Sequence, residues 1–169
     1  MTQSGSRCRC WAFSALLWTI PLAVLAAGGD GGAGGGDARS EASTPEYKQA
    51  LIFIQAERWP EAIALLQQHV KGARDDADGH NWLAYAYRKS GQLEPAFVHY
   101  RRALALVPSH RGAHEYIGEA YLAAGQPDRA EYHLRELARI CYSTCEEFVD
   151  LKAAIGQFRA QPVAAQSRP

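Results

Sequence analysis

The chain has 169 residues, and 47% of them are hydrophobic, which is enough for one modest domain with a buried core and some extensions. Its 18 basic and 18 acidic residues give a formal net charge of zero. This balance argues against a nucleic acid or an anionic membrane surface as the partner, because both attract strongly basic proteins.

The N-terminus has the pattern of a secretory signal peptide. A short segment with Arg7 and Arg9 precedes an apolar, uncharged run over residues 11–27, and small residues follow the run. We predict a cleavable signal over residues 1–28, no membrane contact after cleavage, and a periplasmic or secreted protein. The Ala, Gly and Arg usage indicates a bacterial source. An uncleaved N-terminal anchor is the alternative, because the run approaches the roughly 20 apolar residues of a spanning helix.

A composition change marks where the folded domain begins. Residues 29–43 are rich in glycine and small polar residues, which favour a disordered linker because glycine loses much backbone freedom on ordering. The folded domain is expected over residues 44–160. Residues 161–169 are expected to form a disordered tail.

The remaining sequence has helical periodicity. Thr44 and Pro45 have the types of an N-cap and a first helical residue. Gly91 and Gly125 are suited to the left-handed residue that follows a helix. Apolar residues recur at spacings of three and four throughout. These features predict helices over residues 46–57, 60–71, 79–90, 94–107, 111–124, 127–141 and 145–159.

Residues of one type recur every 34 positions. The aligned sets are Ala62, Ala96 and Ala130; Phe53, Tyr87 and Tyr121; Ala50, Ala84 and Gly118; and the pair Gly91 and Gly125. The offset needs no gap, and it divides the chain into units over residues 43–76, 77–110 and 111–144. Residues 145–159 follow as a capping helix. Small residues at these positions let two antiparallel helices approach closely, and neighbouring hairpins then share a core.

These residues resemble the tetratricopeptide repeat, whose period is 34 residues. The middle unit matches best, through Leu83, Ala84, Tyr87, Gly91, Ala96, Tyr100, Ala103 and Pro108. The first unit departs from the pattern at Glu57, where the family usually has a glycine between its helices. The resemblance implies an all-α solenoid of about three helix-turn-helix repeats, with no cofactor and no catalytic site, that binds another protein.

Two cysteines flank the expected turn before the capping helix. Cys141 and Cys145 are four residues apart, about 6 Å along a helix, which is close to the limit for a disulfide. We predict a structural disulfide. Two free thiols, or redox or metal chemistry, are the alternatives. Thr144 and Glu147 have the spacing of a capping box at the start of the last helix.

Residues on the first helix of each unit are expected to line a concave groove. The predicted partner-binding residues are Tyr47, Lys48, Leu51, Gln55, Asn81, Trp82, Tyr85, Arg88, Lys89, Glu115 and Glu119. Arg88 and Lys89 are expected near the two glutamates. For Trp82 and for Tyr116, which shares this face, the alternative is packing between repeats.

These observations lead to three hypotheses on function. The first is a non-catalytic scaffold or assembly factor in the bacterial periplasm, with a peptide or helix of a protein partner in its groove. The second is a thiol- or metal-linked chaperone for an envelope metalloprotein, which uses Cys141 and Cys145. The third is self-association into a homo-oligomer. Some family members clamp a C-terminal carboxylate, but Tyr47 and Leu51 replace the lysine and asparagine that this clamp needs. We predict no metal site, because the repeat explains the spacing of the histidines.

Overall fold

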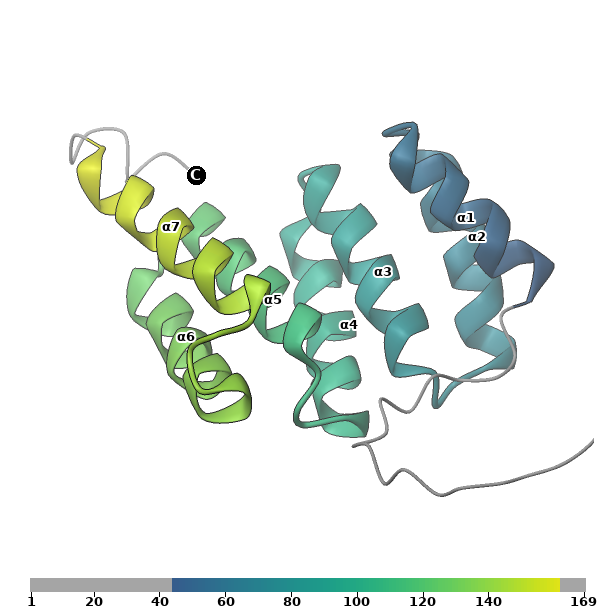
Figure 1. The fold of residues 1–169 in the computed structure, drawn as a ribbon. Helices are drawn as coiled ribbons and strands as arrows, with labels where there is room; N and C mark the ends of the chain where they lie inside the picture. The colour runs from purple at the N-terminus through teal and green to yellow at the C-terminus, as the bar shows by residue number, and fades with distance from the viewer. Residues whose placement is uncertain (1–43, 162–169) are drawn as a thin grey trace, which may run out of the picture. The chain divides into compact units, whose positions relative to one another are not determined.

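The computed structural model describes residues 44–161. The predicted signal peptide and linker, and all of the predicted tail except Gln161, lie outside the described residues. Within them the structure has seven helices (Figure 1): α1 (Pro45–Gln55), α2 (Trp59–Gly72), α3 (Ala77–Lys89), α4 (Leu93–Leu106), α5 (Arg111–Ala123), α6 (Pro127–Cys141) and α7 (Glu146–Ala160). The prediction of an all-α fold is confirmed, and the helix ends differ from the expected ones by two residues at most.

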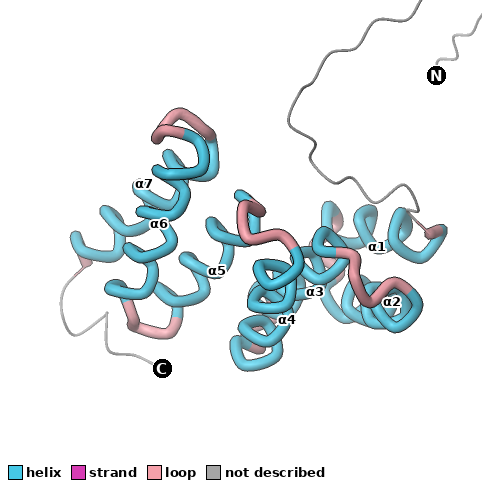
Figure 2. The backbone as a smooth tube through the Cα atoms, turned by 90° about the horizontal axis from the view of Figure 1, so that it is seen from below, coloured by secondary structure: helices cyan, strands magenta, loops and turns pink. Residues whose placement is uncertain are grey.

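The helices form antiparallel hairpins that stack along the chain. Helices α1 and α2, α3 and α4, and α5 and α6 pair as hairpins, and α7 covers α5 and α6 (Figure 2). Ala84, Ala96 and Ala130 are fully buried, which allows the paired helices to approach closely. Each hairpin buries its apolar face against the next, so one core runs through the described residues.

The turns inside the hairpins use left-handed residues, as predicted. Gly91 and Gly125 have φ angles of 80° and 70° in the turns after α3 and α5. Glu57 occupies the same place after α1, with a φ of 55°. An L-residue is strained in this region because its Cβ approaches the backbone, whereas glycine is not.

Replacement of Glu57 by glycine should therefore stabilise the protein. We expect Glu57→Gly to raise the free energy of unfolding by about 1 kcal/mol in chemical denaturation. Glu94→Gly is the matched control, since Glu94 is exposed in the first turn of α4, where glycine should lower the free energy of unfolding by up to about 1 kcal/mol. Equal effects of the two changes would contradict this account.

The start of α7 differs from the prediction. The expected capping box of Thr144 and Glu147 is not formed, because Cys145 is the N-cap and its side chain makes no capping hydrogen bond. The Thr144 hydroxyl instead donates to the Cys141 carbonyl oxygen, at 2.7 Å. Tyr142 and Ser143 adopt left-handed φ angles of 52° and 63°. These two residues turn the chain sharply, so Thr144 serves the end of α6 rather than the start of α7.

Cys141 and Cys145 flank this turn, with their Cα atoms 5.7 Å apart. This separation is typical of disulfides. The predicted bond would connect α6 to α7 through a loop of few residues, and we expect it to stabilise the protein by about 1–3 kcal/mol.

The oxidised state of this pair stays a prediction, and a thiol titration tests it. In the protein without residues 1–28, we expect no reactive thiol under native or denaturing conditions, and two thiols after reduction. Thiols that react without a reductant would contradict the disulfide.

One histidine pair joins the two helices of the second hairpin, and another joins the two helices of the third. The Nδ1 atoms of His80 and His99 are 3.0 Å apart, and those of His114 and His133 are 2.9 Å apart. His80 Nε2 donates to the Arg74 carbonyl oxygen at 3.1 Å, so in the neutral ring its Nδ1 must accept a proton from His99. The same logic applies to His114, whose Nε2 lies 2.9 Å from a carbonyl oxygen. The bond between the two Nδ1 atoms of each pair is therefore lost when both rings are protonated.

Candidate protein-binding face

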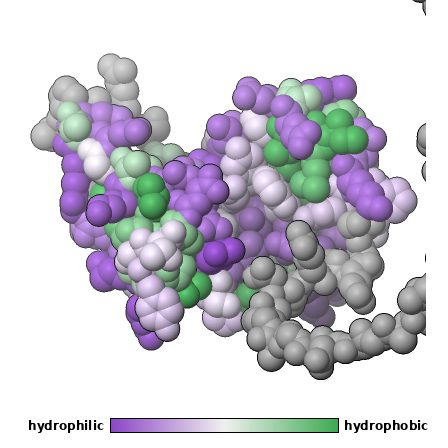
Figure 3. Space-filling model, in the orientation of Figure 1, coloured by the Kyte–Doolittle hydropathy of each residue, from purple (hydrophilic) through white to green (hydrophobic). Residues whose placement is uncertain are grey.

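One face of the array is built by the first helix of every hairpin and by α7. Side chains of α3 contact those of α5, and side chains of α5 contact those of α7. We call the surface of α1, α3, α5 and α7 the first-helix face. Figure 3 shows that the surface is hollowed between the parts that carry α1 and α7.

An aromatic cluster lies on the first-helix face. It consists of Trp59, Trp82, Tyr85 and Tyr116, and each of these side chains is half-buried. The ring centroids of Tyr85 lie 4.9 Å from Tyr116, 5.5 Å from Trp82 and 6.1 Å from Trp59. Trp82 and Tyr116 thus pack between repeats and still expose part of their rings. Partly exposed Trp and Tyr side chains are typical anchors of protein interfaces.

Two cations rest on the aromatic cluster. Arg88 lies over the rings of Tyr85 and Tyr116, and its guanidinium pairs with the Glu119 carboxylate at 2.6 Å. Lys89 is exposed, and its Nζ lies 5.8 Å from the Trp59 ring. The predicted proximity of Arg88 to Glu119 is present, whereas Lys89 contacts aromatic rings. Since the charge of Arg88 is already paired with Glu119, Lys89 is more available than Arg88 to pair with a negatively charged group of a ligand.

The end of the face near α7 is acidic. Glu115 is 9% exposed, and no hydrogen bond or ion pair of its carboxyl group is present among the described residues. Burial and then the charges of Glu119, Asp150 and Glu147 together raise the pKa of Glu115 to about 8, although Arg88 lowers it. The carboxyl group is therefore largely protonated at neutral pH.

Removal of this ionisable group should stabilise the protein. The pKa of Glu115 is higher in the folded state than in the unfolded chain, so stability is lost as the pH rises from about 4.5 to 8. We expect Glu115→Gln to raise the free energy of unfolding at pH 8 by on the order of 2 kcal/mol, with little effect at pH 4. Denaturation at the two pH values measures this. An equal change at both would contradict the buried, protonated carboxyl group.

The other predicted site residues vary in exposure. Lys48 and Gln55 are exposed on α1, and Leu51 is half-buried there. Tyr47 is half-buried, with its ring centroid 4.9 Å from that of His69 in α2. Asn81 is 3% exposed, so it faces the interior between helices more than the solvent.

Sequence analysis missed two contributions to this face. Trp59 comes from the start of a second helix, yet its ring reaches Tyr85. Glu147 and Asp150 lie on the capping helix, outside the three predicted repeat units, but their charges act on Glu115. The sequence does contain a signal for the second contribution. Helix α7 follows α6 as the first helix of a fourth unit would, and this position predicts that it lies on the first-helix face.

Histidine and cysteine side chains are common metal ligands. His110 points to the Asp78 carboxylate at 3.0 Å, whereas His114 points to His133, so these two histidines do not converge. Within residues 44–161, no three His, Cys, Asp or Glu side chains lie close enough together to hold a metal ion. Among the described helices, none has both the length and the apolar character needed to cross a membrane.

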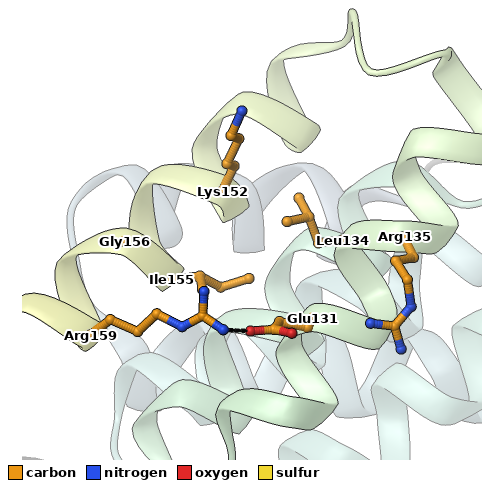
Figure 4. Close-up of a pocket in the computed structure, with 7 residues that line it drawn as sticks. All are labelled: Glu131, Leu134, Arg135, Lys152, Ile155, Gly156 and Arg159. Atoms are coloured by element: carbon orange, nitrogen blue, oxygen red, sulfur yellow. Dashed lines mark hydrogen bonds and ion pairs between the residues drawn. The ribbon is translucent and has the colours of Figure 1, made fainter.

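A separate pocket of about 410 Å³ lies between α6 and α7 (Figure 4). Its lining consists of Glu131, Leu134, Arg135, Lys152, Ile155, Gly156 and Arg159. Arg159 and Glu131 form an ion pair across it, shown by the dashed line. Only the last two helices line this pocket, so it belongs to the end of the array and not to the aromatic cluster.

The fold and this face define an α-solenoid of stacked helical hairpins. Sequence profiles described as tetratricopeptide repeat match residues 77–110 and residues 98–141. Residues 77–141 therefore contain tetratricopeptide repeats, as the 34-residue period indicated. Comparison with curated protein sequences gives no match.

Solved structures with this fold include three protein complexes with peptides or chaperones. The first repeat domain of Spaghetti (RPAP3), bound to an HSP90 peptide, is 17% identical, with a TM-score of 0.61 over 69% of this chain and 91% of that one. The TPR2B domain of yeast Sti1, in a complex with Hsp70, is 20% identical, with a TM-score of 0.59 over 66% and 94%. The Yersinia enterocolitica secretion chaperone SycD, in a complex with a YopD peptide, is 18% identical, with a TM-score of 0.59 over 67% and 86%. At these identities the likeness establishes the fold.

Proposed function

We propose that the chain is a non-catalytic protein–protein interaction scaffold or assembly factor of the bacterial periplasm. Its first-helix face is the predicted concave groove, and a peptide or helix of a partner protein binds there. The aromatic cluster carries this proposal, because it offers half-exposed rings on a rigid array of helices. Such rings bury a large area at low entropic cost when a partner covers them.

The similar structures support the class of ligand. The RPAP3 domain is bound to an HSP90 peptide and SycD to a YopD peptide. A peptide or helix is therefore the ligand that we expect for this chain as well. The periplasmic location rests on residues 1–28 alone.

Crosslinking in the cell envelope followed by mass spectrometry tests the proposal. We expect a defined set of crosslinked envelope proteins with the wild-type chain, and its loss with Tyr85→Ala, which removes the central ring of the cluster. Tyr132→Ala is the matched control, since Tyr132 is 51% exposed on α6, outside the cluster. The same partners with all three proteins would overturn the proposed groove. An untagged chain found only in the cytoplasm would overturn the location.

A further inference from the structure

The acidic end of the first-helix face contains a buried acceptor without a donor. The Asn81 side chain is 3% exposed, and its Oδ1 atom makes no hydrogen bond. It is the one side-chain nitrogen or oxygen within residues 44–161 that is both inaccessible to solvent and without a hydrogen-bond partner. Buried acceptors are almost always paired, because an unpaired one loses its bond to water without compensation. An external donor would remove this cost.

The Asn81 amide faces the stretch of α5 that carries Glu115. Its Nδ2 atom lies 3.5 Å from the place where a Cβ atom of Gly112 would be. Gly112 and Glu115 are three residues apart, about one helical turn, so they lie on the same side of α5. Because Gly112 has no side chain, the space between α3 and α5 beside Asn81 is not filled by α5.

The carboxyl groups at this end have too few cations of their own. Arg88, whose charge acts on Glu115, is already paired with Glu119 at 2.6 Å. Glu147 is only weakly matched, by Arg111 at 3.5 Å. Glu115 is left without a hydrogen-bonding cation, while Asp150 adds further negative charge from α7. The local charge therefore favours a positively charged ligand.

We propose that Asn81, Glu115 and Asp150 form an acceptor site that binds a lysine or arginine side chain of the partner segment. The ammonium or guanidinium group would donate to the Asn81 carbonyl oxygen and to the Glu115 carboxylate. Its aliphatic stem would lie along the aromatic cluster, where Tyr116 neighbours Glu115 in sequence. This inference rests on the proposed function and specifies its ligand as a basic, partly apolar segment. An acidic segment would add charge of the same sign to this end.

Proton release gives the acceptor site a specific signature. A cation binds the ionised form of Glu115, whose pKa is raised to about 8 by burial. Affinity should therefore increase from pH 6 to pH 8.5, where a lysine of the ligand stays charged. The groups that face Glu115 are Glu119 and Arg88 on one side, and Glu147 and Asp150 on the other. Glu115→Gln removes the titratable group that this pH dependence requires.

The experiment uses a phage-displayed library of random 12-residue peptides, selected on the purified protein. The best peptides are synthesised, together with versions in which norleucine replaces lysine, and binding is measured by fluorescence anisotropy. We expect selected peptides with a basic residue among apolar ones. Norleucine should weaken binding to the wild-type protein at least about tenfold, and binding to Glu115→Gln less than about threefold. Glu146→Gln, an exposed neighbour on α7, should behave as wild type.

The outcomes separate this inference from the proposed function. Two results would overturn the acceptor site while the proposed groove remains supported. In the first, Tyr85→Ala weakens binding of peptides that lack basic residues. In the second, the peptides bind Glu115→Gln as tightly as wild type and with the same pH profile. Acidic peptides would also overturn it. A selection without binders, or with binders that neither Tyr85→Ala nor Glu115→Gln affects, would overturn both.

Discussion

Leu151→Ala is expected to lower the free energy of unfolding by roughly 3 kcal/mol. Leu151 is fully buried on α7, where it packs against α5. A Cβ atom added at Gly118 would lie 2.7 Å from both Leu151 methyl carbons, so the leucine fills the space that the glycine leaves. Its truncation opens a cavity under the capping helix, and chemical denaturation measures the loss. Lys152→Ala, at the exposed next position, should have little effect.

Gly118→Ala tests the same contact from the other helix. In the wild-type protein we expect it to destabilise by about 1–3 kcal/mol, because its methyl group has no room beside Leu151. In the Leu151→Ala background the sign should reverse, since the methyl group then enters the cavity and alanine favours the helix by about 1 kcal/mol over glycine. Additive effects in the double variant would contradict direct packing of the two residues.

The second large effect is a loss of stability in mild acid. Burial, and to a smaller extent the charge of the partner ring, lowers the pKa of His99 and of His133 to about 4. The pKa values of His80 and His114 are also lowered, mainly by burial. The unfolded chain binds more protons than the folded one between pH 6.5 and 4. Stability is therefore complete above pH 6.5 and is lost as the pH falls toward 4.

Protonation of each histidine pair should lower the free energy of unfolding by on the order of 2 kcal/mol between pH 6.5 and pH 4, with allowance for the partial exposure of the rings. Urea denaturation at pH 7 and pH 5 measures the change. His133→Gln keeps a donor for His114 but does not titrate, so its loss of stability between these pH values should be smaller than that of wild type. The titration of Glu115 changes the free energy of unfolding in the opposite direction, and this change is the same in wild type and in His133→Gln. An unchanged pH profile for His133→Gln would contradict the paired, neutral rings.

Part of the candidate face followed from the sequence. The 34-residue offset places Trp82, Tyr85, Arg88 and Glu119 on first helices, and the structure brings these side chains together. Arg88 lies three residues after Tyr85, so one helical turn predicts that they share a side of α3. Spacing of this kind depends only on helix geometry, and it can therefore be derived without the tertiary structure.

The sequence by itself determined the class of fold, the number of helices and the hairpin turns at Gly91 and Gly125, because these depend on local periodicity and backbone conformation. The tertiary structure alone decided which side chains meet between repeats. It turns Asn81 and Glu115 inward, carries Trp59 onto the first-helix face and brings Asp150 of α7 toward Glu115. The reason is physical: the angle at which one hairpin stacks on the next arises from the packing of many side chains together, and no local spacing encodes it.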